Sequence, residues 1–358
     1  FSTDSGTIKL DGNYPTGTDN VALGDTALDS IEAGGTNNTA IGDHAGTAIT
    51  TGDHNTAVGK DALLSNTTAG ANTAVGRNSM KDNTTGSDNT AIGESSLREN
   101  ETGCCNAVLG ENAMTLNTSG CYNTSIGSMS LHNNTTASNN TGLGFESLMC
   151  NTTGTANLAL GAYAMCKNTT ANDNTAVGVA ALLVNTTGAQ NTAIGRSALT
   201  ANTTGCRNIA IGYNSLAVNT TGCCNVSIGR TALDANTEGD FNTAVGNSAL
   251  SENTTADNNT AVGYFAMNAN TTGTNNTVVG TCSGASNTTG AQITALGFHS
   301  LCKNSTGEDS TALGYQAMVC NTTGCYNTAV GRQAMRLSTT ANDNSAVGMC
   351  SLYSNTTG

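Results

Sequence analysis

The sequence has no Trp, a single Pro and only five Phe among its 358 residues. Large aromatic side chains supply much of the buried apolar area of globular cores, so a thick globular core is not expected here. Charged residues make up only 10% of the chain, which is too few for a typical disordered sequence. No apolar run approaches the roughly 20 residues that a bilayer requires, so we expect no membrane span.

Positive charge is also scarce, with 12 Lys and Arg against 25 Asp and Glu and a net charge of −13. Binding to nucleic acid depends on clustered cations that neutralise phosphates, so we predict no nucleic-acid partner. No glycine-rich phosphate loop, nucleophile elbow or metalloprotease motif occurs. There is no Cys-x-x-Cys, and the four His lie far from any Cys pair in phase, which disfavours zinc. We therefore predict neither catalysis nor a cofactor.

What the chain does contain is one short repeat. A glycine preceded by Val, Ile or Leu returns every 17 residues from Gly42 to Gly348, and Gly24 belongs to the same series one residue out of phase. We number positions within each copy from this glycine, so that −1 is the residue before it. A unit this short cannot bury an apolar face alone, and its copies must stack on one another.

The residues around the glycine predict short strands. Position −1 is a branched aliphatic residue, −2 is small and most often Ala, and −3 is mostly Thr, an alternation typical of a strand. Ala or Ser at +3 followed by Leu or Met at +4 predicts a second strand, and Asn-Thr-Thr-Gly predicts a turn. We therefore predict an all-β fold, a parallel β-solenoid (β-roll) of about twenty 17-residue coils rising about 4.8 Å each. A strand–helix solenoid is the alternative, disfavoured by the short period and the poor helix formers Gly, Thr and Asn.

Residues 1–20 depart from the repeat and are expected to form a cap or docking segment, with residues 21–358 forming one solenoid domain. The −1 and −2 columns both look suited to close packing. We expect the −1 face to fill the roll, and the small −2 face to fit either a tight single coil or the shared axis of a trimer. The sequence ends within a repeat at Gly358, so we expect the repeat to continue or coil ends to stack head to tail. The predicted partner is thus the chain itself, as a filament or a trimer.

An Asn column at −4 predicts a ladder of stacked side-chain amides that hydrogen-bond from coil to coil. Ile293 and Ser310 interrupt this column, so we expect the ladder to be useful rather than indispensable. The members that we single out are Asn55, Asn72, Asn89, Asn106 and Asn123.

A second Asn column, at +7, begins the segment Asn-x-Ser/Thr, which is the acceptor pattern for N-glycosylation in a secretory pathway. The alternative is that Asn-Thr-Thr-Gly is simply good turn chemistry, and sugars about 4.8 Å apart would crowd one another. Asn236 and Ser338 stand where the pattern is lost. The candidate acceptors are Asn66, Asn83, Asn100, Asn117, Asn134, Asn151, Asn168, Asn185, Asn202, Asn219, Asn253, Asn270, Asn287, Asn304, Asn321 and Asn355.

The thirteen Cys recur in preferred phases. Stacked side chains in neighbouring coils place Cα atoms about 4.8 Å apart, within the range of a disulfide. We predict four coil-to-coil disulfides, two at −6 and two at +5/+6, and hence an oxidising, extracellular setting. The pairs are Cys104 with Cys121, Cys206 with Cys223, Cys150 with Cys166, and Cys302 with Cys320; Cys105, Cys224, Cys282, Cys325 and Cys350 lack an equally good partner.

The motif Asn-Thr-Ala-Ile-Gly-Arg-Ser-Ala-Leu at 191–199 resembles the repeat of YadA-type trimeric autotransporter adhesin heads. It is more closely similar to the Asn-Thr-Ala-Ile-Gly-x-x-Ala-Leu-x-x-Asn-Thr-Thr-Gly arrays of fibre and tail-spike-like proteins. The similarity covers 21–358, although the YadA repeat is shorter because it lacks the Asn-Thr-Thr-Gly turn. The resemblance implies a left-handed β-roll in a surface fibre or adhesin, and it assigns no catalytic residue.

We therefore expect an extracellular structural fibre, filament or adhesin shaft on a cell or virion surface, N-glycosylated and without catalysis. One alternative is a carbohydrate-binding viral or phage tail-fibre shaft. Another is an ice-binding solenoid, because flat β-solenoids with Thr columns can match ice and Thr recurs here at −3, +8 and +9.

Overall fold

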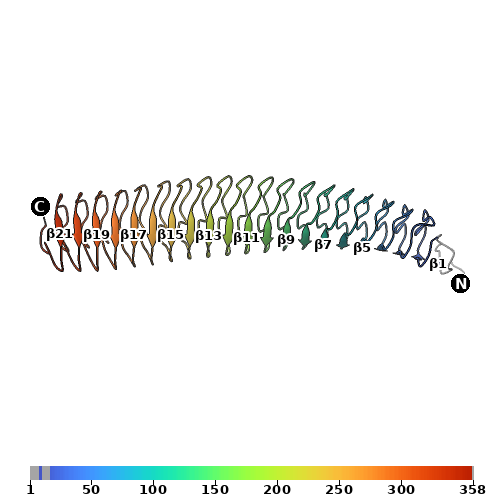
Figure 1. Ribbon diagram of the computed structural model, residues 1–358, viewed down its shortest axis with the longest axis horizontal. Coiled ribbons are helices and arrows are strands. Elements are labelled where there is room, and N and C mark those ends of the chain that lie inside the picture. Colours follow the sequence, from blue (N-terminus) through green and yellow to red (C-terminus); the bar gives the residue numbers. More distant parts are fainter. Residues whose placement is uncertain (1–7, 10–16, 357–358) are drawn as a thin grey trace. The chain divides into compact units, whose positions relative to one another are not determined.

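The computed structural model describes residues 8–9 and 17–356. These residues contain no helix, and their strands are joined entirely by turns and bends. The chain divides into two compact units, unit 1 (Phe1–Asn174) and unit 2 (Thr175–Gly358). Within each unit, successive 17-residue coils contribute one strand each, side by side (Figure 1). The prediction of an all-β parallel solenoid is therefore confirmed.

Unit 1 carries nine parallel strands in register, for example with Thr56 beside Thr73. A short strand, β1 (Ile8–Lys9), pairs antiparallel with the first of them, with Ile8 opposite Leu23. The rest of the expected cap at 1–20 lies almost entirely outside the described residues. The nine strands are β2 (Val21–Leu23), β3 (Thr39–Ile41), β4 (Thr56–Val58), β5 (Thr73–Val75), β6 (Thr90–Ile92), β7 (Ala107–Leu109), β8 (Thr124–Ile126), β9 (Thr141–Leu143) and β10 (Leu158–Leu160).

Unit 2 repeats the pattern, again with equivalent residues side by side, such as Thr243 and Thr260. This register places each motif position directly over its counterpart in the next coil, as the 17-residue period predicts. Its strands are β11 (Thr175–Val177), β12 (Thr192–Ile194), β13 (Ile209–Ile211), β14 (Val226–Ile228), β15 (Thr243–Val245), β16 (Thr260–Val262), β17 (Thr277–Val279), β18 (Thr294–Leu296), β19 (Thr311–Leu313), β20 (Thr328–Val330) and β21 (Ser345–Val347).

The glycine that ends each strand is required by both conformation and space. Gly59 has φ +133°, a region that other residues rarely adopt, and a Cβ there would lie 2.6 Å from the carbonyl oxygen of Gly76 in the next coil. The unbroken glycine column therefore follows from close stacking of backbones.

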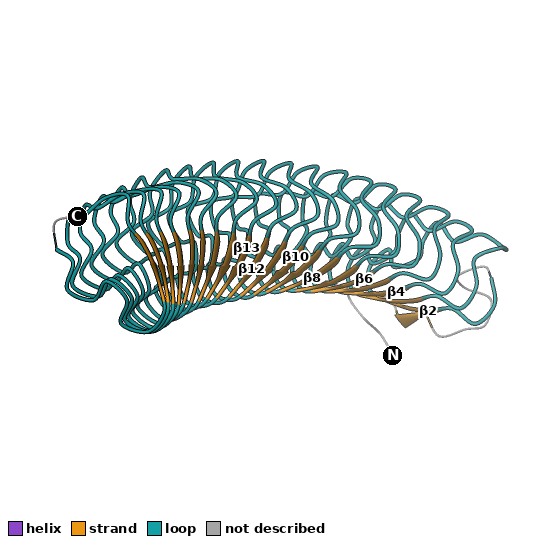
Figure 2. Cartoon of the chain, turned by 60° about the vertical axis from the view of Figure 1, so that its left-hand side comes forward, coloured by secondary structure: helices purple, strands orange, loops and turns teal. Residues whose placement is uncertain are grey.

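The second predicted strand is wrong. The residues after the glycine form turns, with left-handed backbone at +2 and +4, as in Asp61 (φ 57°) and Leu63 (φ 50°). Backbone hydrogen bonds still connect this segment to both neighbouring coils. Leu63 N–H donates to the carbonyl of Ser79 (3.1 Å), and Asp61 N–H donates to the carbonyl of Asp43 (2.9 Å). Figure 2 shows the result, with strands along one side of the coil and loops around the rest.

The strand faces the opposite way from the prediction. The small −2 side chains point into the coil, as with Ala57 at 1% exposure, while the −1 side chains point outward, with Ile41 38% and Leu296 50% exposed. The interior beside −2 is already occupied: a Cβ on Gly142 would lie 2.6 Å from Ser130 Oγ and 3.4 Å from Leu131 Cγ. The Leu or Met at +4 therefore fills the core, and the −2 residues beside it are small, with Val108 and Val278 the largest among them.

Candidate functional site

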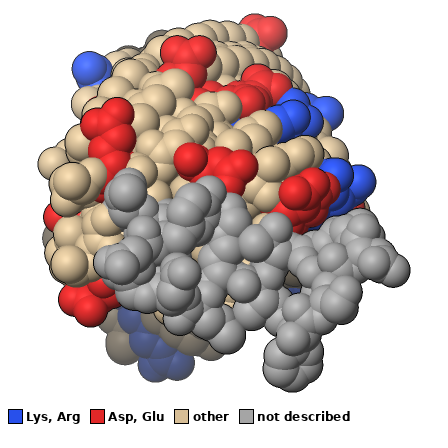
Figure 3. All heavy atoms as spheres, turned by 90° about the vertical axis from the view of Figure 1, so that its right-hand side faces the viewer, with Lys and Arg blue, Asp and Glu red and all other residues tan. Residues whose placement is uncertain are grey.

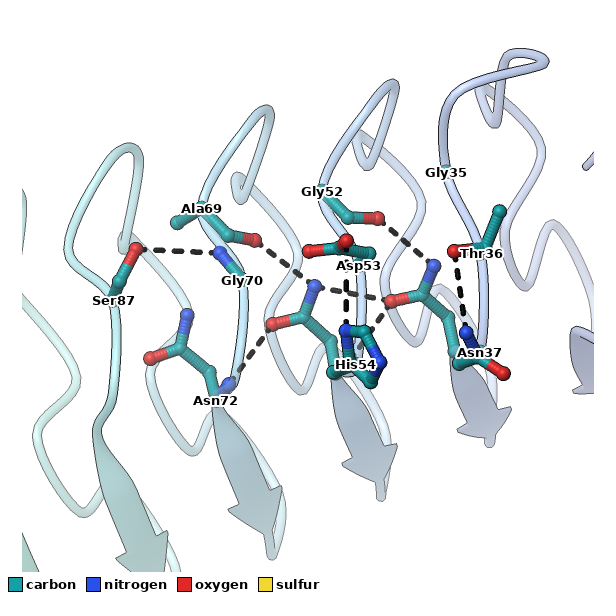
Figure 4. A network of polar contacts seen from close by, with 12 residues as sticks. Gly35, Thr36, Asn37, Gly52, Asp53, His54, Ala69, Gly70, Asn72 and Ser87 are labelled. Atoms are coloured by element: carbon teal, nitrogen blue, oxygen red, sulfur yellow. Dashed lines mark hydrogen bonds and ion pairs between the residues drawn. The ribbon is translucent and has the colours of Figure 1, made fainter.

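The predicted Asn ladder at −4 is present in the described coils. Asn55 is 1% exposed, and its Oδ1 accepts the backbone N–H of Asn72 at 3.1 Å. The Asn72 amide nitrogen then donates to the carbonyl of Gly86 at 2.9 Å. The same bonds recur at Asn89, Asn106 and Asn123, so the ladder is present at all five predicted members. Figure 4 shows the bond donated by the backbone N–H of Asn72.

The two interruptions of this ladder keep part of its main-chain bonding. Ile293 N–H donates to Asn276 Oδ1 at 2.9 Å, and Ser310 Oγ accepts the N–H of Asn327 at 3.2 Å. Ile293 has no side-chain acceptor for the backbone N–H of Ser310, so the ladder is broken between these two residues and resumes at Asn327.

The +7 Asn column is a second internal ladder, and this corrects the glycosylation prediction. Asn134 is fully buried, and its Nδ2 donates to Asn117 Oδ1 (2.9 Å) and to the carbonyl of Ala137 (3.0 Å). Its Oδ1 accepts from Asn151 (3.0 Å). A glycan is attached through Nδ2, which here has two acceptors and no access to solvent.

Glycosylation is therefore wrong for the fifteen fully buried members of the column. Asn355 is half-buried and donates to Asn344 Oδ1 at 3.2 Å. Asn236 lacks the acceptor pattern, yet it forms the same hydrogen bonds as the others. Its presence in the sequence indicates that each coil needs the side-chain amide and not the acceptor pattern. The fifteen are Asn66, Asn83, Asn100, Asn117, Asn134, Asn151, Asn168, Asn185, Asn202, Asn219, Asn253, Asn270, Asn287, Asn304 and Asn321.

Ser338 is a defect in this second ladder. It replaces Asn at +7, and it is fully buried. Within the described residues, Asn321 Oδ1 and Ser338 Oγ are both buried without a hydrogen-bond partner. The serine side chain is too short to restore the link that every earlier coil of unit 2 provides.

The Thr-Thr pair that follows is divided between two roles. The +8 hydroxyl donates to the carbonyl of the next coil, as in Thr118 to Thr135 at 3.2 Å. The +9 residue, such as Thr136, is exposed. The +8 column therefore belongs to the coil-to-coil hydrogen bonding and is not a free hydroxyl array.

Two of the predicted cysteine pairs bring their sulfur atoms together. The Sγ atoms of Cys104 and Cys121 lie 2.8 Å apart, and those of Cys206 and Cys223 lie 3.0 Å apart. All thirteen Cys are thiols in the structure, so the disulfides stay predictions. A hydrogen bond to the Cys121 thiol, reinforced by burial, raises the pKa of Cys104 to about 12.

The other two predicted pairs are joined less directly. Cys150 N–H donates to the carbonyl of Cys166 at 3.0 Å, and burial raises the pKa of the Cys166 thiol to about 11. Burial likewise raises the pKa of Cys302, which lies near Cys282 and Cys320. The Cys166 and Cys302 thiols are therefore protonated at neutral pH.

The outward side of the strands is a site that sequence reasoning missed. We call the −3 and −1 side chains of β2–β21 the strand face. Neither column contains a charged residue: Thr is most frequent at −3 and every −1 residue is Val, Ile or Leu. Exposed apolar area of this regularity is uncommon on monomeric proteins and marks binding surfaces. Elsewhere the acidic side chains lie on several sides of the visible surface (Figure 3).

Ion pairs follow the edge of this face in unit 1. At +1, the Lys60 ammonium lies 2.6 Å from the Asp43 carboxylate of the preceding coil. Arg77, also at +1, pairs with Glu94 of the following coil. The hydrogen bond from Lys60 lowers the pKa of Asp43. Both pairs are exposed, so they contribute little to stability, and the charges within each pair cancel.

No protein-family model matches the chain, and no curated protein matches it. The resemblance to YadA-type and fibre repeats thus rests on the motif alone and stays a prediction. Among the described residues, no three His, Cys, Asp or Glu side chains are grouped closely enough to hold a metal ion. That part of the chain also contains no helix able to cross a membrane.

Proposed function

We propose that this chain is the structural shaft of an extracellular fibre or adhesin on a cell or virion surface, and that it carries out no catalysis. The observation that carries the proposal is the linkage of each coil to the next. Strand pairing on one side and two buried Asn ladders connect successive coils around the whole cross-section. Such linkage suits an element that bears load along the coil axis.

The cysteines support an oxidising environment. Cys104–Cys121 and Cys206–Cys223 are already in contact, so an external oxidant such as a small disulfide would convert each thiol pair to a disulfide without moving the backbone far. The uncharged strand face supports self-association, because a soluble protein gains free energy by covering it.

The test is to raise antibodies to the purified chain and label intact source cells or virions, alongside electron microscopy of the protein. Surface labelling and unbranched elongated particles are expected. Mass spectrometry under non-reducing conditions should show the loss of two hydrogen atoms for each disulfide. Labelling confined to permeabilised cells, with all thiols free, would contradict the proposal.

Ice binding is a second candidate, and the outward strand face favours it. In most coils the face presents Thr at −3 and a branched aliphatic at −1, as with Thr260 and Val262. The Thr columns at +8 and +9 lie in turns, whereas the −3 column lies on strands. Thermal hysteresis should then be present and should fall in Thr260→Tyr but not in the exposed turn variant Thr255→Tyr. Absence of hysteresis in the unmodified chain rejects this candidate.

A further inference from the structure

The strand face is large enough to hold two copies together. In unit 1, nine coils at about 4.8 Å give the strand face a length of about 43 Å. With the adjoining +1 column, it covers the five positions from −3 to +1, a width of about 16 Å. Covering it removes roughly 700 Å² from each partner, or roughly 1,400 Å² in total, which falls within the range of stable protein–protein interfaces. Only a surface with the same layer spacing can match it coil for coil.

The +1 column along one edge of the face has opposite charge in the two units. In unit 1 it contains four carboxylates and two cations, and the cations are paired within the column, which leaves Asp25 and Glu111 in excess. In unit 2 it contains three exposed guanidiniums, Arg196, Arg230 and Arg332, and no acid.

The three guanidiniums are available to a partner. Within the described residues, none of them forms an ion pair with a carboxylate; Arg332 lies over the ring of Tyr315, 5.8 Å from its centroid. The remaining unit 2 positions in the column are uncharged, and several are exposed aromatics: Tyr213, Tyr264, Phe298 and Tyr315. Arg and aromatic side chains of this kind are enriched at the centres of interfaces.

The opposite edge of the face, the −5 column, decides the orientation. It is acidic in unit 1 (Asp19, Asp88 and Asp173) and weakly acidic in unit 2 (Asp309 and Asp343 with Arg207). Turning one copy about the coil axis would set +1 edges against −5 edges and bring the carboxylates of two unit 1 faces together. Turning it about the strand direction sets +1 edge against +1 edge, with coil axes antiparallel.

We infer that unit 1 of one copy pairs face to face with unit 2 of a second copy of this chain, with their coil axes antiparallel. The −1 aliphatic columns meet in the middle, and the unit 1 carboxylates at +1 lie opposite the unit 2 guanidiniums. This inference rests on the proposed self-association and adds its face, its orientation and its specificity. Charge complementarity between the +1 columns favours this pairing over the other orientations, and burial of the apolar −1 columns stabilises it.

Charge reversal tests the inference. Variant A is Arg196→Glu with Arg230→Glu, and variant B is Asp25→Lys with Glu111→Lys. In each, the facing +1 columns acquire the same sign, so self-association measured by sedimentation at low salt should weaken by about tenfold or more. The control for A is Lys167→Glu with Lys303→Glu, two exposed cations at +6 on the turn side of the coil, with the same change in net charge.

Recombination of the variants tests the orientation. Mixing A with B places opposite charges together again, so a mixed species should form where neither variant associates alone. A chain carrying all four changes should recover self-association. Carbodiimide should then join the amines introduced into its unit 1 to the carboxylates introduced into unit 2 of another copy, as read by peptide mass spectrometry.

The outcomes separate the inference from the proposed function. Weakening in A and B, restoration on recombination and an unchanged control would support the pairing. Association that is equally strong in all variants would overturn the pairing while leaving the fibre proposal in place. Unmodified chain that stays monomeric at every concentration would overturn both.

Discussion

Replacing Ser338 with Asn should restore the +7 ladder of unit 2 at Asn321, whose Oδ1 has no hydrogen-bond partner. In every regular coil, the +7 amide nitrogen donates to the Oδ1 of the previous Asn and to the carbonyl three residues ahead, as Asn134 does. In Ser338→Asn these acceptors are Asn321 Oδ1, now unpaired, and the carbonyl of Ala341. That carbonyl already accepts from Asn327, just as Ala137 accepts from both Asn123 and Asn134.

The expected gain follows from the groups that become paired. Satisfying a buried acceptor recovers about 1–3 kcal/mol, and a second hydrogen bond adds about 1 kcal/mol. Ordering the larger side chain costs about 1 kcal/mol. The substitution should therefore stabilise unit 2 by about 1–3 kcal/mol, and the coil has room for it because Asn fills the same position in its neighbours.

Thermal unfolding and amide hydrogen exchange measure this gain. The Tm should rise by several degrees if unit 2 unfolds cooperatively, and exchange should slow most between residues 321 and 341. Ser338→Asp is the matched control, since it has the same shape but presents a carboxylate to Asn321 Oδ1 in place of a donor, and it should destabilise. Equal stability of the Asn and Asp variants would refute the ladder as a source of stability.

Two further substitutions and two changes of condition test the fold, the sequons and the thiols. Gly59→Ala should cost more than about 2 kcal/mol in unfolding free energy, from positive φ and the clash with the next coil, and wild-type stability would show that the coils stack less closely. Asn134→Ala should cost about 3 kcal/mol because it leaves buried donors and acceptors unpaired, whereas a loss below about 0.5 kcal/mol would contradict its role. In protein secreted from a glycosylating host, the fifteen buried +7 residues should still be Asn after amidase treatment, and their conversion to Asp in peptide mass spectra would restore the sequon interpretation. The pKa of Cys104 is raised from 9.0 to about 12, so this thiol should stabilise the reduced protein fully below pH 9 and lose that contribution as the pH rises toward 12. A disulfide-bonded sample should show no such loss in Tm. Identical pH profiles of Tm for the two samples would count against the thiol contact.

The 17-residue period was sufficient to predict the architecture, because equivalent residues one period apart must stack when each coil is too small to fold alone. The −4 ladder followed for the same reason. Asn55 and Asn72 could be placed in contact from the sequence, since stacking of identical amides needs only the layer spacing.

The direction of the strand could not be predicted, because an alternation of period two defines two faces without saying which one is buried. Apolar character suggested −1, but the interior beside the strand is filled by Leu63 and its equivalents at +4, and the buried −2 residues beside them are mostly Ala and never larger than Val. The strand face was missed as a consequence.

The second strand and the glycosylation column failed for a different reason. Leu63 and Asn66 belong to a turn segment with left-handed backbone at +2 and +4, and Leu or Met at +4 gives no sign of this conformation because such residues rarely adopt it. This backbone turns both side chains inward. The Asn-Thr-Thr segment was interpreted as an exposed glycan acceptor because a sequence pattern does not show which side chains are buried.

The central claim is that each motif forms one layer of a strand-paired stack. X-ray diffraction from an aligned, concentrated sample tests it most directly. The account predicts a sharp reflection at about 4.8 Å along the direction of alignment. Its absence, or a layer spacing near 10 Å set by packed helices, would contradict the stacking on which the ladders, the thiol pairs and the strand face all depend.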